Sequence, residues 1–198
     1  METLAENVPM DSGNEGKPGN IFLVGLMGSG KTSVGKVLAR MLDKVFVDSD
    51  HEIERATGVR IPVIFEIEGE SKFRERERKM IAELVARDNV VLATGGGAIL
   101  AAENREALKT NGTVIYLRAP VKSLLRRTQR DRNRPLLQVA DPAVTLQELY
   151  VARDPLYRDT ADLIFDTNNQ SVRALAMRIA QKLQQPESPA ANNQPVSA

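Results

Sequence analysis

The fold of this chain is decided by the stretch Gly25-Leu26-Met27-Gly28-Ser29-Gly30-Lys31-Thr32. The stretch fits the pattern G-x-x-x-x-G-K-S/T, a glycine-rich turn that cradles phosphate between a strand and a helix. An apolar run at 21–24 precedes it, and a run with apolar residues at helical spacing follows over 31–42. Because the context matches as well as the pattern, we interpret the stretch as a phosphate-binding P-loop. The alternative is a glycine-rich turn that binds nothing.

The P-loop predicts nucleotide binding through its backbone and through two of its side chains. Its glycines allow successive amides to converge on phosphate oxygens, and the positive end of the following helix favours an anion at that point. Lys31 adds a cation for the β- and γ-phosphates, and the Thr32 hydroxyl can ligate Mg²⁺.

The composition indicates one globular domain. The chain has 198 residues, of which 42% are hydrophobic, which is enough for a core. A net charge of +1 gives no global attraction to nucleic acid or membrane, and the lack of cysteine excludes disulfides and thiol chemistry. There is neither a membrane-spanning apolar stretch nor a secretory signal, so we expect a cytoplasmic protein. The polar ends at 1–19 and 184–198 are predicted to be disordered tails around a domain at 20–183.

Strands and helices are predicted to alternate along the chain. Short buried strands are expected at 21–24, 45–47, 90–93, 114–117 and 163–165, and helices at 31–42, 71–86, 121–130 and 146–157. Ser171 is expected to cap a last helix whose inner face carries Val172, Leu175, Ala176, Ile179 and Leu183. This order implies an α/β fold, with a parallel sheet between helices and with ligands beyond the carboxyl ends of the strands.

Two carboxylates, Asp48 and Asp50, follow the second predicted strand. In an extended segment they would point the same way, one toward a metal and the other toward an acceptor hydroxyl, as phosphoryl transfer to an alcohol requires. The alternative is that Asp50 only caps a helix that starts at His51. The neighbouring P-loop favours the chemical interpretation.

The triplet Gly95-Gly96-Gly97 ends the third strand. It could let a ligand approach bare backbone, or it could be a flexible turn. Arg74 lies in a strongly charged run and nothing in its local pattern singles it out. In that run Arg76, Glu77 and Arg78 are interpreted as a solvated helix face with ion pairs.

Five arginines crowd the segment from Arg126 to Arg134. A nucleic-acid patch is one interpretation, but aromatic residues are not interleaved and the chain is nearly neutral. Beside a P-loop, an arginine-rich lid that closes over ATP is favoured, with Pro135 and Pro142 marking a loop. His51 is expected at the surface, and core positions without chemistry are assigned to Met80, Leu156 and Tyr157.

Six motifs, in this order, give the chain its resemblance to a known family. They are the P-loop, Asp48-Ser49-Asp50, Glu68-Gly69-Glu70 with Phe73-Arg74, Thr94-Gly95-Gly96-Gly97, Arg134-Pro135-Leu136-Leu137, and Arg153-Asp154-Pro155-Leu156-Tyr157. Together they make the chain resemble a shikimate kinase of the bacterial type, over roughly 21–170. The P-loop alone would indicate only a very large superfamily, whereas the combination is much more specific.

The resemblance implies a P-loop kinase fold with five parallel strands in the order 2-3-1-4-5. It also implies a substrate-binding flap at about 50–80 and a lid at about 126–141. The implied reaction is ATP-dependent phosphorylation of the 3-hydroxyl of shikimate, giving shikimate 3-phosphate and ADP on the route to chorismate and aromatic amino acids. ATP is the implied co-substrate and Mg²⁺ the implied cofactor.

The resemblance also implies roles for individual residues. Phosphates of ATP are assigned to Gly28, Ser29, Gly30, Lys31, Thr32 and Ser33, with Thr32 and Asp48 at the metal. Asp50 would bind the shikimate hydroxyls and orient or deprotonate the attacking one. The shikimate carboxylate is assigned to Arg74 and Arg153, and the ring hydroxyls to Gly96 with its neighbours Gly95 and Gly97. Arg134 would reach from the lid to the phosphates, and Arg127 and Gln170 would lie near the adenine. Catalysis is assigned to Lys31, Asp50 and Arg134.

Two other functions are weighed against this one. A related small-molecule kinase, such as a gluconate kinase, would share the P-loop, although the motif set favours shikimate. A nucleotide-binding switch would hydrolyse GTP slowly without an acceptor, but the sequence has no guanine-reading N-K-x-D segment. For partners, the sequence predicts only ATP and shikimate, no nucleic acid or membrane, and a monomer.

Overall fold

The computed structural model describes residues 19–129, 135–137, 139–168 and 170–185. Most of the two predicted tails, Arg134 and part of the predicted lid lie outside these residues. Near the start of the described residues, the Asn20 side-chain Nδ2 donates to the Arg87 carbonyl at 2.6 Å and its Oδ1 accepts from the Val90 amide at 3.1 Å.

Five parallel strands form one sheet in the order β2-β3-β1-β4-β5, which confirms the predicted order. The strands are β1 Ile21–Val24, β2 Val45–Asp48, β3 Val90–Ala93, β4 Thr113–Arg118 and β5 Leu163–Asp166. The described helices are α1 Lys31–Met41, α2 Ser49–Thr57, α3 Ile61–Val85, α4 Ala102–Asn111, α5 Val121–Thr128, α6 Pro142–Thr160 and α7 Val172–Gln184, with short 3₁₀ turns η1 Ala98–Leu100 and η2 Pro135–Leu137. Within the described residues, no helix is long and apolar enough to cross a membrane.

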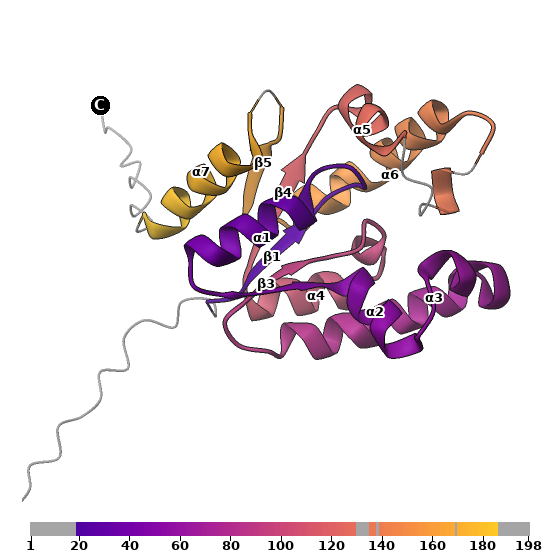
Figure 1. Cartoon of the computed structure of the whole chain (residues 1–198), viewed down its shortest axis with the longest axis horizontal. Helices are drawn as coiled ribbons and strands as arrows, with labels where there is room; N and C mark the ends of the chain where they lie inside the picture. Colours follow the sequence, from indigo (N-terminus) through magenta and orange to yellow (C-terminus); the bar gives the residue numbers. More distant parts are fainter. Residues whose placement is uncertain (1–18, 130–134, 138, 169, 186–198) are drawn as a thin grey trace, which may run out of the picture.

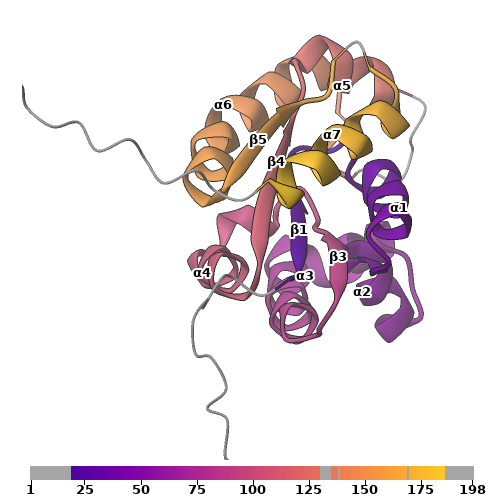
Figure 2. The ribbon, with the colours of Figure 1, turned by 90° about the vertical axis from the view of Figure 1, so that its left-hand side faces the viewer.

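Alternate residues of the central strand β1 serve the two faces of the sheet. Ile21 and Leu23 pack with α1 and α7, whereas Phe22 and Val24 pack with the larger core that α3, α4, α5 and α6 complete. Figure 1 shows this layered arrangement, and Figure 2 shows α1 and α7 together on one side of the sheet with α4 on the other. Since both faces of β1 are covered, its side chains are buried throughout, as expected for a central parallel strand.

The two outer strands are less buried than the sequence suggests. β2 and β5 lie at the edges of the sheet, and Val45 and Ile164 are 60% and 41% exposed. The prediction of short buried strands was therefore wrong for 45–47 and 163–165, because an apolar run does not reveal whether a strand has one neighbour or two.

Two helices begin earlier than predicted, and one inner-face position of a third helix differs from the prediction. α3 begins at Ile61 rather than at Ser71, and it bends at Gly69, whose backbone is non-helical with φ 79° and ψ 169°. Pro142 is not in a loop but begins α6, where a missing amide hydrogen costs nothing. Ser171 caps α7 as predicted, accepting from the Ala174 amide at 3.2 Å, but Val172 is 40% exposed and does not belong to the inner face.

Candidate active site

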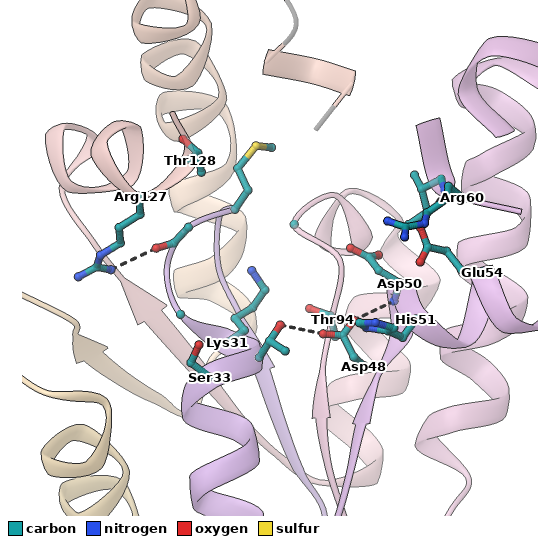
Figure 3. A pocket seen from close by; sticks show the side chains of 16 residues that line it. Lys31, Ser33, Asp48, Asp50, His51, Glu54, Arg60, Thr94, Arg127 and Thr128 are labelled. Carbon is teal, nitrogen blue, oxygen red and sulfur yellow. Dashed lines mark hydrogen bonds between the residues drawn. The ribbon is translucent and has the colours of Figure 1, made fainter. Parts of the chain in front are cut away.

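The P-loop opens into a cavity of about 650 Å³ at the carboxyl end of the sheet. Lys31 begins α1, and its Nζ donates to the carbonyl oxygens of Gly25 at 2.7 Å and Leu26 at 3.0 Å. Figure 3 shows Lys31 pointing into this cavity from one side and Asp50 from the other. The structure therefore places a cation and a carboxylate across the same space.

Backbone shape explains the glycines of the P-loop. Gly30 is the residue before α1 and has φ 101°, and Gly28 has φ 78°, values at which a side chain would be strained. Gly28, Gly30, Lys31, Thr32 and Ser33 line the cavity. Ser29 does not line it; its side chain is buried and Oγ has no hydrogen-bond partner among the described residues.

Two side-chain oxygens that line the cavity, one from Thr32 and one from Asp48, lie next to each other. Thr32 Oγ1 donates to Asp48 Oδ2 at 2.8 Å, joining the start of α1 to the end of β2. The other oxygen of Asp48, Oδ1, accepts from the Asp50 amide at 3.1 Å and so caps α2. The cap of this helix is thus Asp48 and not Asp50, and Asp50 lies inside the first turn of α2. The expectation of two aspartates in one extended segment was wrong, although both still face the cavity.

Asp50 shares its surroundings with a second carboxylate, Glu77 of α3. A Cβ added to Gly95 would lie 2.6 Å from both Asp50 Oδ1 and Glu77 Oε1, so the two carboxylates converge on this bare α-carbon. The triplet glycines have ordinary backbone angles, since none is among the positive-φ residues. Gly95 and Gly97 leave room for the side chains of Asp50, Glu77 and Arg74, and Gly96 lies against the backbone of the P-loop. The structure thus gives the triplet a packing role, and its contact with a ligand stays a prediction.

Glu77 corrects the prediction of a solvated helix face. Arg76 and Arg78 are exposed as predicted, but Glu77 is 1% exposed and its Oε2 accepts from Arg74 Nη1 at 2.7 Å. Its Oε1 has no hydrogen-bond partner among the described residues. Burial raises the pKa of Glu77, Arg74 opposes the rise, and the charge of Asp50 adds to it. The signal was available in the sequence, because Glu77 interrupts the helical stripe of Phe73, Ile81 and Leu84.

Two arginines border a small side chamber of about 70 Å³ that opens beside Asp50. Arg74 comes from α3, and Arg153 comes from α6 with only 4% of its surface exposed. Burial lowers the pKa of Arg153, and the charge of Arg74 acts in the same direction. Arg74 is paired with two carboxylates, since its Nη2 lies 2.7 Å from Glu70 Oε1 and its Nη1 lies 2.7 Å from Glu77 Oε2. The positive charge of Arg74 is therefore partly neutralised, whereas Arg153 is the more buried of the two cations. A Cβ on Gly97 would overlap the Arg74 guanidinium, so this glycine makes room for it.

The Gly96 carbonyl joins the chamber to α6. It accepts from Arg153 Nη1 at 3.1 Å and from Tyr157 Oη at 2.6 Å. Tyr157 is buried as predicted. Its hydrogen bond to the Gly96 carbonyl at the site was not predicted. The available signal was its spacing of four residues from Arg153, which places both on one face of a helix.

Comparisons with known proteins agree with this geometry. The family model for shikimate kinase matches residues 27–184. The chain belongs to the shikimate kinase family. It is 58% identical over 168 residues to the enzyme of Nitrosomonas europaea, covering 85% of this chain and 80% of that one. It is 60% identical over 166 residues to the enzyme of Nitrosococcus oceani, covering 84% and 87%. The solved shikimate kinase of Acinetobacter baumannii in complex with shikimate superposes with a TM-score of 0.82 at 55% identity, covering 84% of this chain and 93% of that one.

Membership of the shikimate kinase family makes the chain an ATP-dependent kinase and a transferase. It also favours a shikimate kinase over the two alternatives, a gluconate kinase and a GTP-hydrolysing switch. The P-loop fold with strand order 2-3-1-4-5 is confirmed by the sheet itself and by the solved members of this family.

The remaining residues predicted from the shikimate kinase motifs fall in different places. Arg127 of α5 lies at the cavity, donating through Nη1 to Gly28 O and Thr167 Oγ1, both at 3.1 Å. Gln170 does not line the cavity; its Nε2 donates to the Asp166 carbonyl and its Oε1 accepts from Arg178 at 2.9 Å. Arg134 lies outside the described residues.

Proposed function

We propose that this shikimate kinase transfers the γ-phosphoryl group of ATP to the 3-hydroxyl of shikimate, giving shikimate 3-phosphate and ADP. One observation carries the proposal: the P-loop cavity and the arginine-bordered chamber share Asp50 and Gly96 as lining residues. Two substrates bound in adjoining spaces would meet at that junction, where the acceptor oxygen can approach the terminal phosphorus.

At the nucleotide end, the proposed contacts of the ATP phosphates are the amides of 28–33 and the Lys31 ammonium. Arg127, held beside Gly28, would lie toward the nucleoside. The expected Mg²⁺ fits the pair formed by Thr32 Oγ1 and Asp48 Oδ2, because hydroxyl and carboxylate oxygens are ligands that Mg²⁺ prefers. When bound there, Mg²⁺ would neutralise charge on the phosphate oxygens.

At the acceptor end, the charges of the chamber suit a small anionic polyol. Arg74 and Arg153 would hold the shikimate carboxylate, since guanidinium groups bind carboxylates through paired hydrogen bonds. The ring hydroxyls are proposed to contact Gly96, which lines the chamber together with Gly95 and Gly97. Asp50, at the boundary between the two spaces, would accept a hydrogen bond from the attacking hydroxyl.

The proposed reaction follows from these positions. The 3-hydroxyl oxygen forms a bond to the γ-phosphorus as the bond from that phosphorus to the bridging oxygen of ADP breaks. The hydroxyl proton passes to an Asp50 carboxylate oxygen. Lys31 stabilises negative charge on the oxygens of the transferring group and on ADP. Arg134 is proposed to add a further positive charge from the lid.

The test is ADP formation from ATP with and without shikimate, with gluconate as a control acceptor. We expect strong stimulation by shikimate and none by gluconate. Asp50→Asn should lower kcat by a factor of about 100 or more, the scale of a general base, with little change in ATP binding. Equal turnover with every acceptor would reject shikimate as the substrate, and an Asp50→Asn enzyme of normal kcat would remove Asp50 from the reaction.

Two further expectations from the sequence, a cytoplasmic location and a monomeric state, stay predictions. Light scattering of the purified chain at several concentrations tests the second of them, because a monomer keeps the 21.8 kDa mass of the single chain at each concentration.

A further inference from the structure

One carbonyl oxygen, that of Gly96, receives two hydrogen bonds from the same helix. Tyr157 Oη donates at 2.6 Å and Arg153 Nη1 donates at 3.1 Å. Both side chains are almost completely buried, at 1% and 4% exposure. Gly96 itself is half-buried, and one partner is enough to satisfy a carbonyl oxygen. The second donor therefore has a further consequence, because the carbonyl cannot turn without breaking two hydrogen bonds.

The opposite side of Gly96 lies against the P-loop. A Cβ added to Gly96 would be 3.3 Å from the Met27 amide nitrogen and 3.6 Å from the Gly25 carbonyl oxygen. This residue therefore separates the nucleotide loop from α6 by the thickness of one peptide. Any shift of Gly96 would change the distance between the P-loop and the Arg153 guanidinium.

The helix that carries both donors is weakened between them. Pro155 lies inside α6, where it has no amide hydrogen to donate to the Val151 carbonyl. Arg153 and Tyr157 lie on either side of this proline and four residues apart, so they project from one face. Their shared acceptor links the two halves of the helix across its weakest point.

The aromatic ring of Tyr157 has a separate anchor. It stacks on Tyr116 of β4 with ring centroids 4.8 Å apart. The Tyr116 hydroxyl donates to Asp154 Oδ1 at 2.8 Å rather than to the Gly96 carbonyl. The ring position is thus set by stacking, and the Tyr157 hydroxyl is left to act on Gly96. Burial raises the pKa of Tyr157, so the hydroxyl remains a donor throughout the neutral pH range.

We propose that Tyr157 is a positioning residue of the acceptor site: its hydroxyl fixes the Gly96 carbonyl, and through it the placement of Arg153 relative to the P-loop. The inference rests on the proposed function, because it takes Arg153 to be a ligand of the shikimate carboxylate. With the carbonyl fixed by Tyr157, the Arg153 guanidinium is held through Nη1 at Gly96 while it lines the chamber. Without the hydroxyl, Arg153 and Gly96 can move together, and the acceptor would bind out of line with the γ-phosphorus.

The alternative is that the Tyr157 hydroxyl is only a satisfied polar atom in the core. Both interpretations expect Tyr157→Phe to cost stability, since a buried hydrogen bond is lost. They differ in kinetics, because only a positioning role affects the acceptor and spares the nucleotide.

The experiment compares Tyr157→Phe with Tyr116→Phe in the full chain. The second variant is a matched control, because it removes a buried hydroxyl from the other ring of the same stack. Steady-state kinetics with varied shikimate and varied ATP are measured for both, together with urea unfolding. For Tyr157→Phe we expect kcat/KM for shikimate to fall about 3- to 10-fold, the scale of one hydrogen bond, while the KM for ATP stays within about twofold. Tyr116→Phe should keep the wild-type kcat/KM for both substrates at a similar loss of stability.

Three outcomes would overturn the positioning role. They are equal kinetics for the two variants, a parallel loss of affinity for shikimate and ATP in Tyr157→Phe, and a Tyr157→Phe chain that cannot fold while Tyr116→Phe folds. None of these depends on the proposed function failing, which would appear separately as a wild-type enzyme whose ADP formation does not respond to shikimate.

Discussion

At the scale of single residues, the site is a small volume in which charges of both signs are buried together. Asp50 and Glu77 converge on Gly95 while Arg74 and Arg153 border the same chamber. Burying charge is costly unless it is paired, and the pairing of Arg74 with Glu77 meets that cost in part. A proton on Glu77 would leave Arg74 less neutralised and the chamber more attractive to an anion.

The first prediction concerns the ionisation of Glu77. Its folded-state pKa is raised above the usual 4.5 by burial, so its stabilising contribution is complete below about pH 4.5 and is lost as pH rises through the folded-state pKa. Glu77→Gln cannot ionise and lacks this loss. We expect the unfolding free energy of Glu77→Gln relative to wild type to increase with pH above 4.5, by no more than about 1.4 kcal/mol per pH unit, and then level off.

Urea unfolding of both proteins at intervals between pH 4.5 and 8 measures this difference. Taking the difference removes the titration of groups shared by the two chains. A relative stability that falls as pH rises would mean that Arg74 dominates and that the pKa of Glu77 is lowered.

The second prediction concerns Gly97. An added Cβ would meet the far end of the Arg74 side chain, which can move aside, rather than backbone. Gly97→Ala should therefore fold normally while displacing Arg74 from the chamber. We expect shikimate affinity to fall about 10- to 100-fold, the scale of a hydrogen bond to a charged group, and ATP affinity to stay unchanged. Titration calorimetry with each substrate measures both; unchanged shikimate binding would remove Arg74 from the acceptor site.

At the scale of elements, the bend in α3 is made by one residue. Gly69 has φ 79° and ψ 169°, a region that essentially only glycine occupies. The bend separates the first part of α3, whose Ile61 and Phe65 line the side chamber, from the part that carries Arg74 and Glu77. One helix can therefore contribute two walls of the chamber.

The third prediction uses two glycines with positive φ and open surroundings. Neither Gly58 nor Gly69 has any atom near an added Cβ, so substitution tests the backbone alone. Gly58 follows α2 with φ 73° and ψ 3°, a left-handed conformation that other residues tolerate at a cost. We expect Gly58→Ala to lose about 1 kcal/mol and Gly69→Ala to lose about 2–3 kcal/mol in urea unfolding. Equal losses would show that α3 can bend differently at 69.

At the scale of the whole molecule, a sheet covered on both faces supports a site at the carboxyl ends of its strands. The P-loop follows β1, Asp48 ends β2, and the glycine triplet comes shortly after β3. Because the carboxyl ends of parallel strands lie on the same side of the sheet, these three segments are brought together by the sheet itself. The central strand β1 is buried throughout and the edge strand β5 is partly exposed, so we expect the central strands to contribute more to stability.

The fourth prediction compares an isoleucine in an inner strand with one at the sheet edge. Ile115 of β4 is completely buried, whereas Ile164 of β5 is 41% exposed. Ile115→Ala should lower the unfolding free energy by about 2–5 kcal/mol through lost burial and a cavity, and Ile164→Ala by less than about 1 kcal/mol. Urea unfolding measures the two losses of free energy, provided that the m-value of each variant equals that of the wild type. Similar losses would mean that β5 is as essential to the core as β4.

Most of the fold could be predicted from local patterns. The P-loop, the five strands and the capping Ser171 are each encoded within about ten consecutive residues, where periodicity and turn chemistry act directly. The errors concern residues whose burial depends on segments that are distant in the sequence. Val45 and Ile164 are exposed because their strands have one neighbour, and Glu77 is buried because a chamber forms around it.

The sequence by itself determined the phosphate-binding turn, the alternation of strands and helices and the motif set of the family, since these depend on neighbours along the chain. Only the tertiary structure decided that Glu77 faces Asp50 across Gly95 and that Tyr157 and Arg153 share the Gly96 carbonyl. Each of these contacts joins segments that are distant in the sequence and adjacent in space, because the carboxyl ends of parallel strands lie together. Burial at this place also shifts the pKa of a charged side chain, as it does for Glu77.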